Sequence, residues 1–125
     1  MTCATQHTHV SKPWGSETIL VNNDMYCGKL LNINPNCRLS LQYHALKDET
    51  ISLVSGRASL CIYESISDNS PAEVWDISPG MSYRIRPNTI HRIATADIPA
   101  VLLEVSTHHR DSDVYRISDD YRRPV

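Results

Sequence analysis

The chain has 125 residues, a length typical of one compact domain, and no low-complexity run or long linker divides it. Hydrophobic residues make up 41% of the chain, which is enough for a core, but no apolar run is long enough to cross a membrane. The net charge of −2, without a stripe of basic residues, argues against nucleic-acid binding, because phosphate backbones require clustered Lys and Arg.

We expect residues 1–11 to form a loose N-terminal tail. They lack a basic start followed by an apolar stretch, so they do not have the pattern of a secretory signal, and we expect a cytoplasmic protein. The rest of the chain consists of short runs rich in β-forming residues, separated by turn compositions such as "NPN" and "SPGM". These runs cover residues 18–21, 26–33, 38–44, 50–56, 58–64, 72–78, 82–86, 91–95 and 100–107.

No stretch shows a sustained helical period of apolar residues. Only "HALKD" (44–48) and "HRDSDVYR" (109–116) are candidates for a turn of helix. Many short strands at close spacing, without helices, predict an all-β antiparallel sandwich or barrel. A single jelly-roll domain over residues 1–125 is the natural form.

Four polar residues form a candidate metal site. Gln42 and His44 lie two apart in "LSLQYH", so their side chains point to the same face of a strand. The four residues 45–48 then allow the next strand to bring Glu49 beside them, and His91 follows alone in "RPNTIH". Imidazole, carboxylate and amide groups suit zinc, iron, manganese, nickel or cobalt, and the ligand types alone do not choose among them. The alternative is that His44 is an ordinary polar residue on a solvated strand face.

The same residues resemble the motifs of the cupin superfamily. The first motif is present from Gln42 to the turn residue Gly56, without its opening glycine, and Asn88 stands where the second motif has a glycine. The segments "KPWGSE", "LSLQYH", "HRI", "LLEVST" and "ISDDYRR" make the chain similar to the cupin domain of mannose-6-phosphate isomerases, as fused to mannose-1-phosphate guanylyltransferases. That family has further histidines where this chain has Ala45, Leu46 and Thr50.

The resemblance implies a cupin jelly-roll barrel (a double-stranded β-helix) that uses one divalent metal ion, with zinc favoured. It implies a sugar-phosphate isomerase in which the ion polarises a carbonyl and stabilises an enediolate. Two alternatives remain open: a metal-dependent tailoring enzyme with dioxygenase, lyase or rearrangement chemistry, and a non-catalytic module that binds a metal or a ligand. Cupin folds host all three, so the fold does not decide among them.

Several charged residues are candidates for catalysis and substrate binding. Glu104, Glu49 or Lys29 could act as the base that moves a proton between C1 and C2, and the sequence does not decide which. Lys29 shares a face with apolar neighbours, so it either reaches solvent or meets a carboxylate or an anionic substrate. Arg92, next to the expected ligand His91, and Lys47, in the loop before Glu49, are the expected contacts for an anionic small-molecule substrate.

Two further expectations concern surfaces. If Gln42 and His44 face inward, then Leu39, Leu41 and Tyr43 face outward, and an apolar face of that kind needs a cover. We expect the N-terminal segment or a second subunit to cover it, and a homodimer is common among the proteins that this chain resembles. The histidines near the chain ends are expected to be exposed to solvent; these are His7, His9, His108 and His109.

Overall fold

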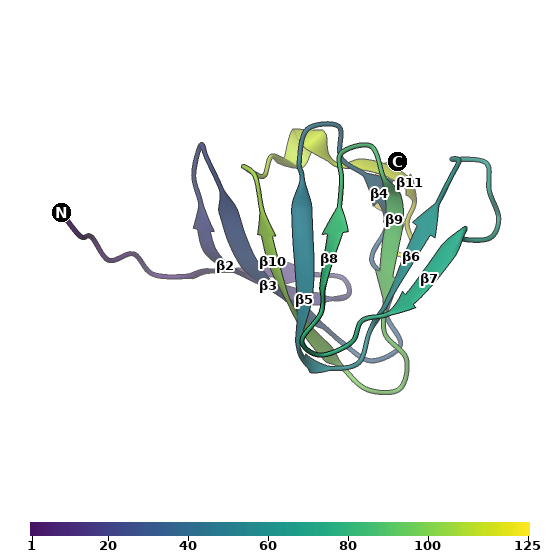
Figure 1. Cartoon of the computed structure of the whole chain (residues 1–125), viewed down its shortest axis with the longest axis horizontal. Helices are drawn as coiled ribbons and strands as arrows, with labels where there is room; N and C mark the ends of the chain where they lie inside the picture. Colours follow the sequence, from purple (N-terminus) through teal and green to yellow (C-terminus); the bar gives the residue numbers. More distant parts are fainter.

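The computed structural model describes all 125 residues, and it is built almost entirely from β-strands arranged in two antiparallel sheets (Figure 1). The six-stranded sheet has the order β1-β2-β3-β10-β5-β8, and the five-stranded sheet has the order β11-β4-β9-β6-β7. The strands are Thr8–Lys12 (β1), Gly15–Asn22 (β2), Cys27–Ile33 (β3), Leu41–Tyr43 (β4), Glu49–Gly56 (β5), Ser59–Tyr63 (β6), Glu73–Asp76 (β7), Ser82–Ile85 (β8), Ile90–Ala94 (β9), Ala100–Ser106 (β10) and Tyr115–Ser118 (β11).

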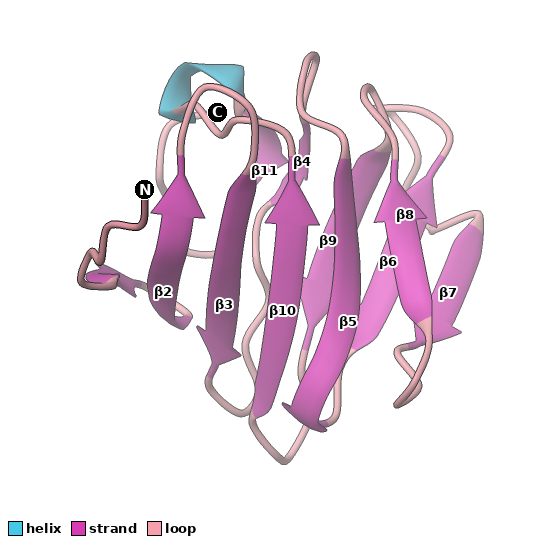
Figure 2. Cartoon of the chain, turned by 60° about the vertical axis from the view of Figure 1, so that its left-hand side comes forward, coloured by secondary structure: helices cyan, strands magenta, loops and turns pink.

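The two sheets face each other and enclose one core, as Figure 2 shows with the six-stranded sheet in front. This arrangement confirms the all-β jelly-roll fold predicted from the sequence. The single helical element is a short 3-10 turn, η1 (Asp111–Asp113), within the segment that was a candidate for a helical turn. No helix combines the length and the hydropathy that crossing a bilayer requires.

Two strands differ from the sequence prediction. Residues 8–12 form β1, paired with β2 from Thr8↔Ile19 to Lys12↔Gly15, so the expected loose tail 1–11 is shorter than predicted. Residues 115–118 form β11, which pairs with β4. Residues 8–12 become a strand because they fold back on the adjacent β2 in a tight hairpin, and residues 115–118 become one because the distant β4 offers backbone hydrogen-bond partners.

The inner face of the six-stranded sheet changes from apolar to charged along the strands. In β3 the inward side chains run from Ile33 through Leu31 to Lys29, and on the antiparallel neighbour β10 the residue opposite Lys29 is Glu104. At the apolar end the inward residues join a core cluster of 12 buried residues, which includes Ile51 of β5. The charged end therefore lies inside the barrel, where functional groups are enclosed by the two sheets.

Two turn positions agree with the sequence reading. Gly56 ends β5 with φ of 80°, and a Cβ built there would collide with the carbonyl oxygen of Pro99. Asn88, in the place of a motif glycine, has φ of 63°, the left-handed conformation that asparagine tolerates better than other non-glycine residues. The backbone N–H of Asn88 donates to the carbonyl oxygen of His44, so this turn is tied to the strand end that carries a candidate ligand.

The expected apolar outer face of residues 39–43 is wrong in part. Leu39 belongs to the buried core cluster because residues 39 and 40 lie outside the regular strand, so simple alternation does not hold there. Leu41 is also buried, and Tyr43 stacks on Tyr115 of β11 with ring centroids 5.0 Å apart. The C-terminal strand thus covers Tyr43 within one chain. The homodimer stays a prediction. The apolar face that motivated it is covered within a single chain.

Candidate metal centre

The charged end of the barrel contains a polar cavity of about 70 Å³, lined by residues of both sheets and of the C-terminal segment. Pockets that enclose whole small-molecule ligands have volumes of about 300–1,000 Å³, so this cavity has room for an ion, a few water molecules or one end of a ligand. His91, Glu49 and Gln42 line it from three different strands, β9, β5 and β4.

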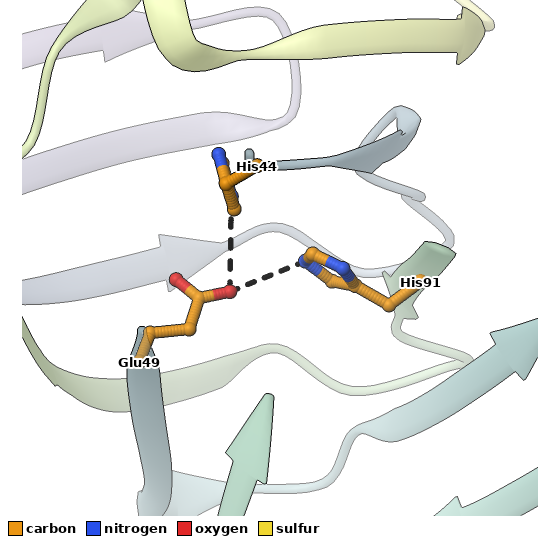
Figure 3. A group of neighbouring side chains, drawn as sticks. All are labelled: His44, Glu49 and His91. Atoms are coloured by element: carbon orange, nitrogen blue, oxygen red, sulfur yellow. Dashed lines mark ion pairs between the residues drawn. The ribbon is translucent and has the colours of Figure 1, made fainter. Parts of the chain in front are cut away.

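Three buried side chains converge beside the cavity: His44, Glu49 and His91 (Figure 3). One donor atom from each lies within 4.8 Å of the other two. The Nε2 atom of His91 is 3.2 Å from Oε1 of Glu49, and the Nε2 atom of His44 is 3.8 Å from the same oxygen. Both histidines and the carboxylate therefore aim their donor atoms at one point.

The hydrogen bonds of the two histidines fix their tautomers. Nδ1 of His44 lies 3.1 Å from the carbonyl oxygen of Asp113, and Nδ1 of His91 lies 2.8 Å from that of Thr89. A carbonyl oxygen only accepts, so each Nδ1 carries the proton that it donates. In the neutral rings, both Nε2 atoms then present lone pairs toward the Glu49 carboxylate. Metal-binding histidines are commonly oriented in this way by a bond from the other ring nitrogen.

One buried atom of this group, Nε2 of His44, has no partner, whereas Oε2 of Glu49 makes no regular hydrogen bond but is ion-paired with Nζ of Lys47. Burial, followed by the positive charge of Lys47, lowers the pKa of His44 to about 4, so its ring is neutral at pH 7. Burial opposes ionisation of Glu49, but the neighbouring imidazole of His91 and the charge of Lys47 outweigh it and lower its pKa well below the usual value. An anionic carboxylate facing lone pairs is an arrangement that a cation completes, so these residues fit a divalent ion.

Gln42 lies on β4 directly opposite His91 on β9, and it lines the same cavity. Its Oε1 accepts a hydrogen bond of 2.6 Å from the hydroxyl of Ser40. The structure thus brings together the four candidate ligands that the sequence singled out, with three of them in mutual contact distance and Gln42 beside them. Two imidazoles, a carboxylate and an amide do not select one ion among zinc, iron, manganese, nickel and cobalt.

Next to this group lies a row of alternating charges. Nζ of Lys47 is 3.0 Å from Oε2 of Glu49 and donates to Oε2 of Glu104 at 3.2 Å. Nζ of Lys29 is 3.9 Å from Oε2 of Glu104 and donates to Oε2 of Glu17 at 3.1 Å. Lys29 is thus paired with carboxylates inside the barrel instead of reaching solvent. Lys47 is buried within the site, and not at an exposed rim.

The pKa values in this row separate the roles of its members. Burial, followed by the negative charge of Glu49, raises the pKa of Glu104. Burial disfavours the Lys47 ammonium, but the carboxylates of Glu104 and Glu49 outweigh that effect and raise its pKa. Lys47 therefore stays protonated as a donor, whereas Glu104 is the carboxyl group of this row that holds a proton more tightly than usual.

His109 is a cavity residue, and the expectation that it is solvent-exposed is wrong. Its Nδ1 accepts from Nζ of Lys47 at 3.2 Å, and its Nε2 donates to Oδ1 of Asp111 at 3.1 Å. Burial, followed by the charges of Lys29 and Lys47, lowers its pKa to about 4. The sequence signal was its position a few residues after the strand that carries Glu104, since a chain leaving that strand crosses the charged end of the barrel.

Arg92 does not contact the cavity, which contradicts its expected role in substrate binding. It is buried, and its guanidinium donates to the carbonyl oxygens of Leu39 at 2.9 Å and Ser118 at 3.4 Å. The same Nη2 that donates to Ser118 lies 3.7 Å from the carboxylate of Asp120. Alternation along β9 explains the error: the neighbour of an inward His91 faces outward, here under the C-terminal segment.

Asp113 is a structural determinant of the site that the sequence did not reveal. Its buried carboxylate accepts hydrogen bonds from the backbone N–H groups of Ala45, Leu46 and Lys47 at 2.9, 3.1 and 3.0 Å. Its carbonyl oxygen accepts from His44. One residue of η1 thus holds the loop between two candidate ligands and orients one of them.

The sequence is similar to a family described as mannose-6-phosphate isomerase C-terminal, which matches residues 2–119. A mannose-1-phosphate guanylyltransferase of Salmonella muenchen is 30% identical over 115 residues, which cover 90% of this chain and 23% of that protein. The alginate biosynthesis protein AlgA of Pseudomonas aeruginosa is 28% identical over 120 residues, which cover 94% of this chain and 23% of that protein. The chain thus spans about a quarter of the length of these relatives.

Solved structures share the fold at low sequence identity. The capsular polysaccharide assembling protein CapF of Staphylococcus aureus superposes with a TM-score of 0.75 at 17% identity, covering 92% of this chain and 32% of that one. Oxalate decarboxylase of Bacillus subtilis superposes with a TM-score of 0.74 at 13% identity, covering 93% of this chain and 33% of that one. At these identities the likeness establishes the cupin fold alone.

Proposed function

The chain belongs to the mannose-6-phosphate isomerase C-terminal family, and from this premise we propose that it is a metal-dependent isomerase of phosphosugars. The observation that carries the proposal is the convergence of His44, Glu49 and His91, in which the buried Nε2 of His44 lacks a hydrogen-bond partner. Those three residues, with Gln42, would hold one divalent ion. Zinc is the ion that the resemblance to this family favours, and its usual ligands include imidazole and carboxylate groups.

A divalent ion in this site supplies Lewis acidity, which polarises a sugar carbonyl. The residues of the chain supply proton transfer and orientation. Glu104 removes the proton from C2 of the aldose and returns it to C1, while the proton of the C2 hydroxyl passes to the C1 oxygen; its raised pKa makes Glu104 a stronger base than an ordinary carboxylate. Lys47 donates hydrogen bonds to Glu104 and to His109, so it keeps the Glu104 carboxylate oriented toward the cavity.

The size of the cavity favours a second candidate function, a non-catalytic module that binds a metal or a small ligand. A volume of about 70 Å³ does not enclose a hexose phosphate. An isomerase requires that the reacting end alone enters, or that side chains at the mouth move. A binding module requires neither. The two candidates differ in whether sugar phosphates are converted.

The test combines elemental analysis with an isomerisation assay on the purified full chain. We expect one divalent ion per chain and interconversion of mannose 6-phosphate and fructose 6-phosphate, abolished by a chelator and restored by the ion. Glu104→Gln should keep the metal and lose about 10²- to 10⁴-fold in rate, the usual contribution of general acid–base catalysis. Glu64→Gln, which changes an exposed glutamate, is the matched control.

His44→Ala should lose both metal and activity, whereas His7→Ala, in the exposed N-terminal segment, should retain both. Metal-loaded protein that leaves sugar phosphates unchanged would contradict the isomerase and support the binding module. Redox-active iron or manganese in the purified protein, together with inactivity on sugar phosphates, would instead support tailoring chemistry of the dioxygenase type.

A further inference from the structure

Arg116 lies in line with two of the candidate metal ligands. On β11 it is directly opposite Gln42 of β4, which is in turn directly opposite His91 of β9. All three residues line the cavity. Adjacent strands are about 4.8 Å apart, so the Arg116 backbone is about 10 Å from that of His91. A cationic side chain therefore reaches the cavity from the strand two positions away from a candidate ligand.

Arg116 is the one lysine or arginine of the cavity lining without a carboxylate partner. The others have ion pairs at 3.9, 3.1, 3.0 and 2.9 Å, and they are Lys12, Lys29, Lys47 and Arg123. The buried Nε atom of Arg116 has no hydrogen-bond acceptor. The nearby Asp119 does not satisfy it, because both of its oxygens are engaged by Arg123, at 2.9 and 3.1 Å.

A buried guanidinium N–H without an acceptor is unfavourable, because its hydration is lost and nothing replaces it. Proteins commonly leave such a group unpaired where a ligand supplies the acceptor. Guanidinium groups match the paired oxygens of phosphates and carboxylates. The missing partner of Arg116 is therefore an anionic oxygen.

We propose that Arg116 forms an anion subsite for the phosphate or carboxylate of an acidic sugar whose other end reaches the metal centre. That the other end of the ligand reaches the metal centre rests on the proposed function. The proposal also names the substrate class, an acidic sugar. It also replaces Arg92, which faces away from the cavity, as the cation that recognises the charged end of the ligand.

The dimensions agree with this assignment. Arg116 and His91 line the same cavity from backbones about 10 Å apart, so one small molecule can contact both side chains. Only the reacting end then has to fit the small cavity. Two other cations of the lining, Lys12 and Arg123, have side chains that are 25% and 21% exposed, so the cavity is reached by solvent.

The test is equilibrium binding, measured by calorimetry on the full chain with mannose 6-phosphate, mannuronic acid and uncharged mannose. We expect wild-type protein to bind at least one of the two acids more tightly than mannose, and the preferred acid identifies a phosphate or a carboxylate ligand. Arg116→Met should weaken binding of that acid by about ten- to a hundredfold, the effect of losing a charge-assisted hydrogen bond. Metal content and the affinity for mannose should not change.

Arg57→Met is the matched control, since Arg57 is exposed in the turn after β5, and it should bind like wild type. If Arg116→Met does not fold, the unmodified protein provides a second measurement. The Nε–H resonance of Arg116 in nitrogen-15 NMR should shift on titration with the preferred acid and not with mannose.

Equal binding of acids and mannose by wild type would overturn the subsite. An Arg116→Met variant that binds the acid like wild type would also overturn it, as would an unchanged Arg116 Nε–H resonance. None of these measurements requires turnover. A folded protein that binds acidic sugars through Arg116 but does not isomerise them would contradict the proposed function and leave the subsite standing.

Discussion

Replacing Asp113 with asparagine tests whether the 3-10 turn η1 positions the metal centre. The Asp113 carboxylate accepts from three consecutive backbone N–H groups, and its main chain orients His44. Asparagine keeps one oxygen and turns an NH2 group toward at least one of these donors. Losing one hydrogen bond to a buried charged group costs about 1.5–3 kcal/mol. For a domain of this size the unfolding midpoint should fall by about 5–15 °C.

The same substitution should weaken metal binding. A looser loop at residues 45–47 and a less constrained His44 ring remove support of a kind that typically contributes about 10- to 100-fold in metal affinity. Thermal unfolding of the metal-free protein, followed by circular dichroism, measures the first effect. Competition with a chromophoric chelator measures the second. Asp97→Asn is the control, because Asp97 is exposed and its side chain makes no hydrogen bond.

The two readouts distinguish the explanations. A lower midpoint with unchanged metal affinity would show that Asp113 supports the fold and does not position the ligands. An unchanged midpoint would refute the reasoning altogether, because it would mean that three short hydrogen bonds to a buried carboxylate contribute nothing.

Three further predictions follow from the same geometry. Gly56→Ala should lower the unfolding midpoint more than Gly80→Ala. Both glycines have φ of 80°, a conformation that costs alanine about 1–2 kcal/mol, but only Gly56 also faces a backbone carbonyl oxygen. Equal midpoints of the two variants would contradict this. Arg92→Met should lower the unfolding midpoint without weakening the binding of acidic sugars, because Arg92 faces away from the cavity. Weaker binding of acidic sugars in calorimetry would show that Arg92 does contact the substrate. Zinc at about 100 times its dissociation constant should stabilise the protein by about 2.7 kcal/mol, measured by chemical unfolding, and the gain should be absent in His44→Ala; a gain in that variant would place the ion elsewhere.

The sequence alone determined the fold class and the neighbourhood of the candidate ligands. Alternation along a strand requires Gln42 and His44 to share a face, and a short loop between adjacent strands limits how far away Glu49 can lie. The turn at Gly56 was predictable for the same reason, because a positive φ is a local property of one residue. Such features depend on residues close together along the chain, and local rules are sufficient for them.

The functions of charged residues away from that motif were decided by the tertiary structure. The sequence offered Lys29 and Glu104 as candidate bases and Lys47 and Arg92 as candidate anion contacts. Only the packing of β3, β10 and the loop before β5 brings Lys29, Glu104 and Lys47 together. Arg92 faces away from the cavity, because neighbouring side chains on a strand point to opposite faces. His91 lies in the cavity, and Arg92, one residue later on β9, lies under the C-terminal segment.

Apart from the position of His109 soon after β10, local patterns did not predict the contribution of the C-terminal segment. His109, Asp113 and Arg116 lie beyond the last strand expected from the sequence, and each reaches the site through contacts with residues far away along the chain. Asp113 and His44 are hydrogen-bonded across 69 positions. Spacing rules relate only neighbours within a strand or a turn, whereas the closure of the two sheets determines which distant segments cover the open end of the barrel.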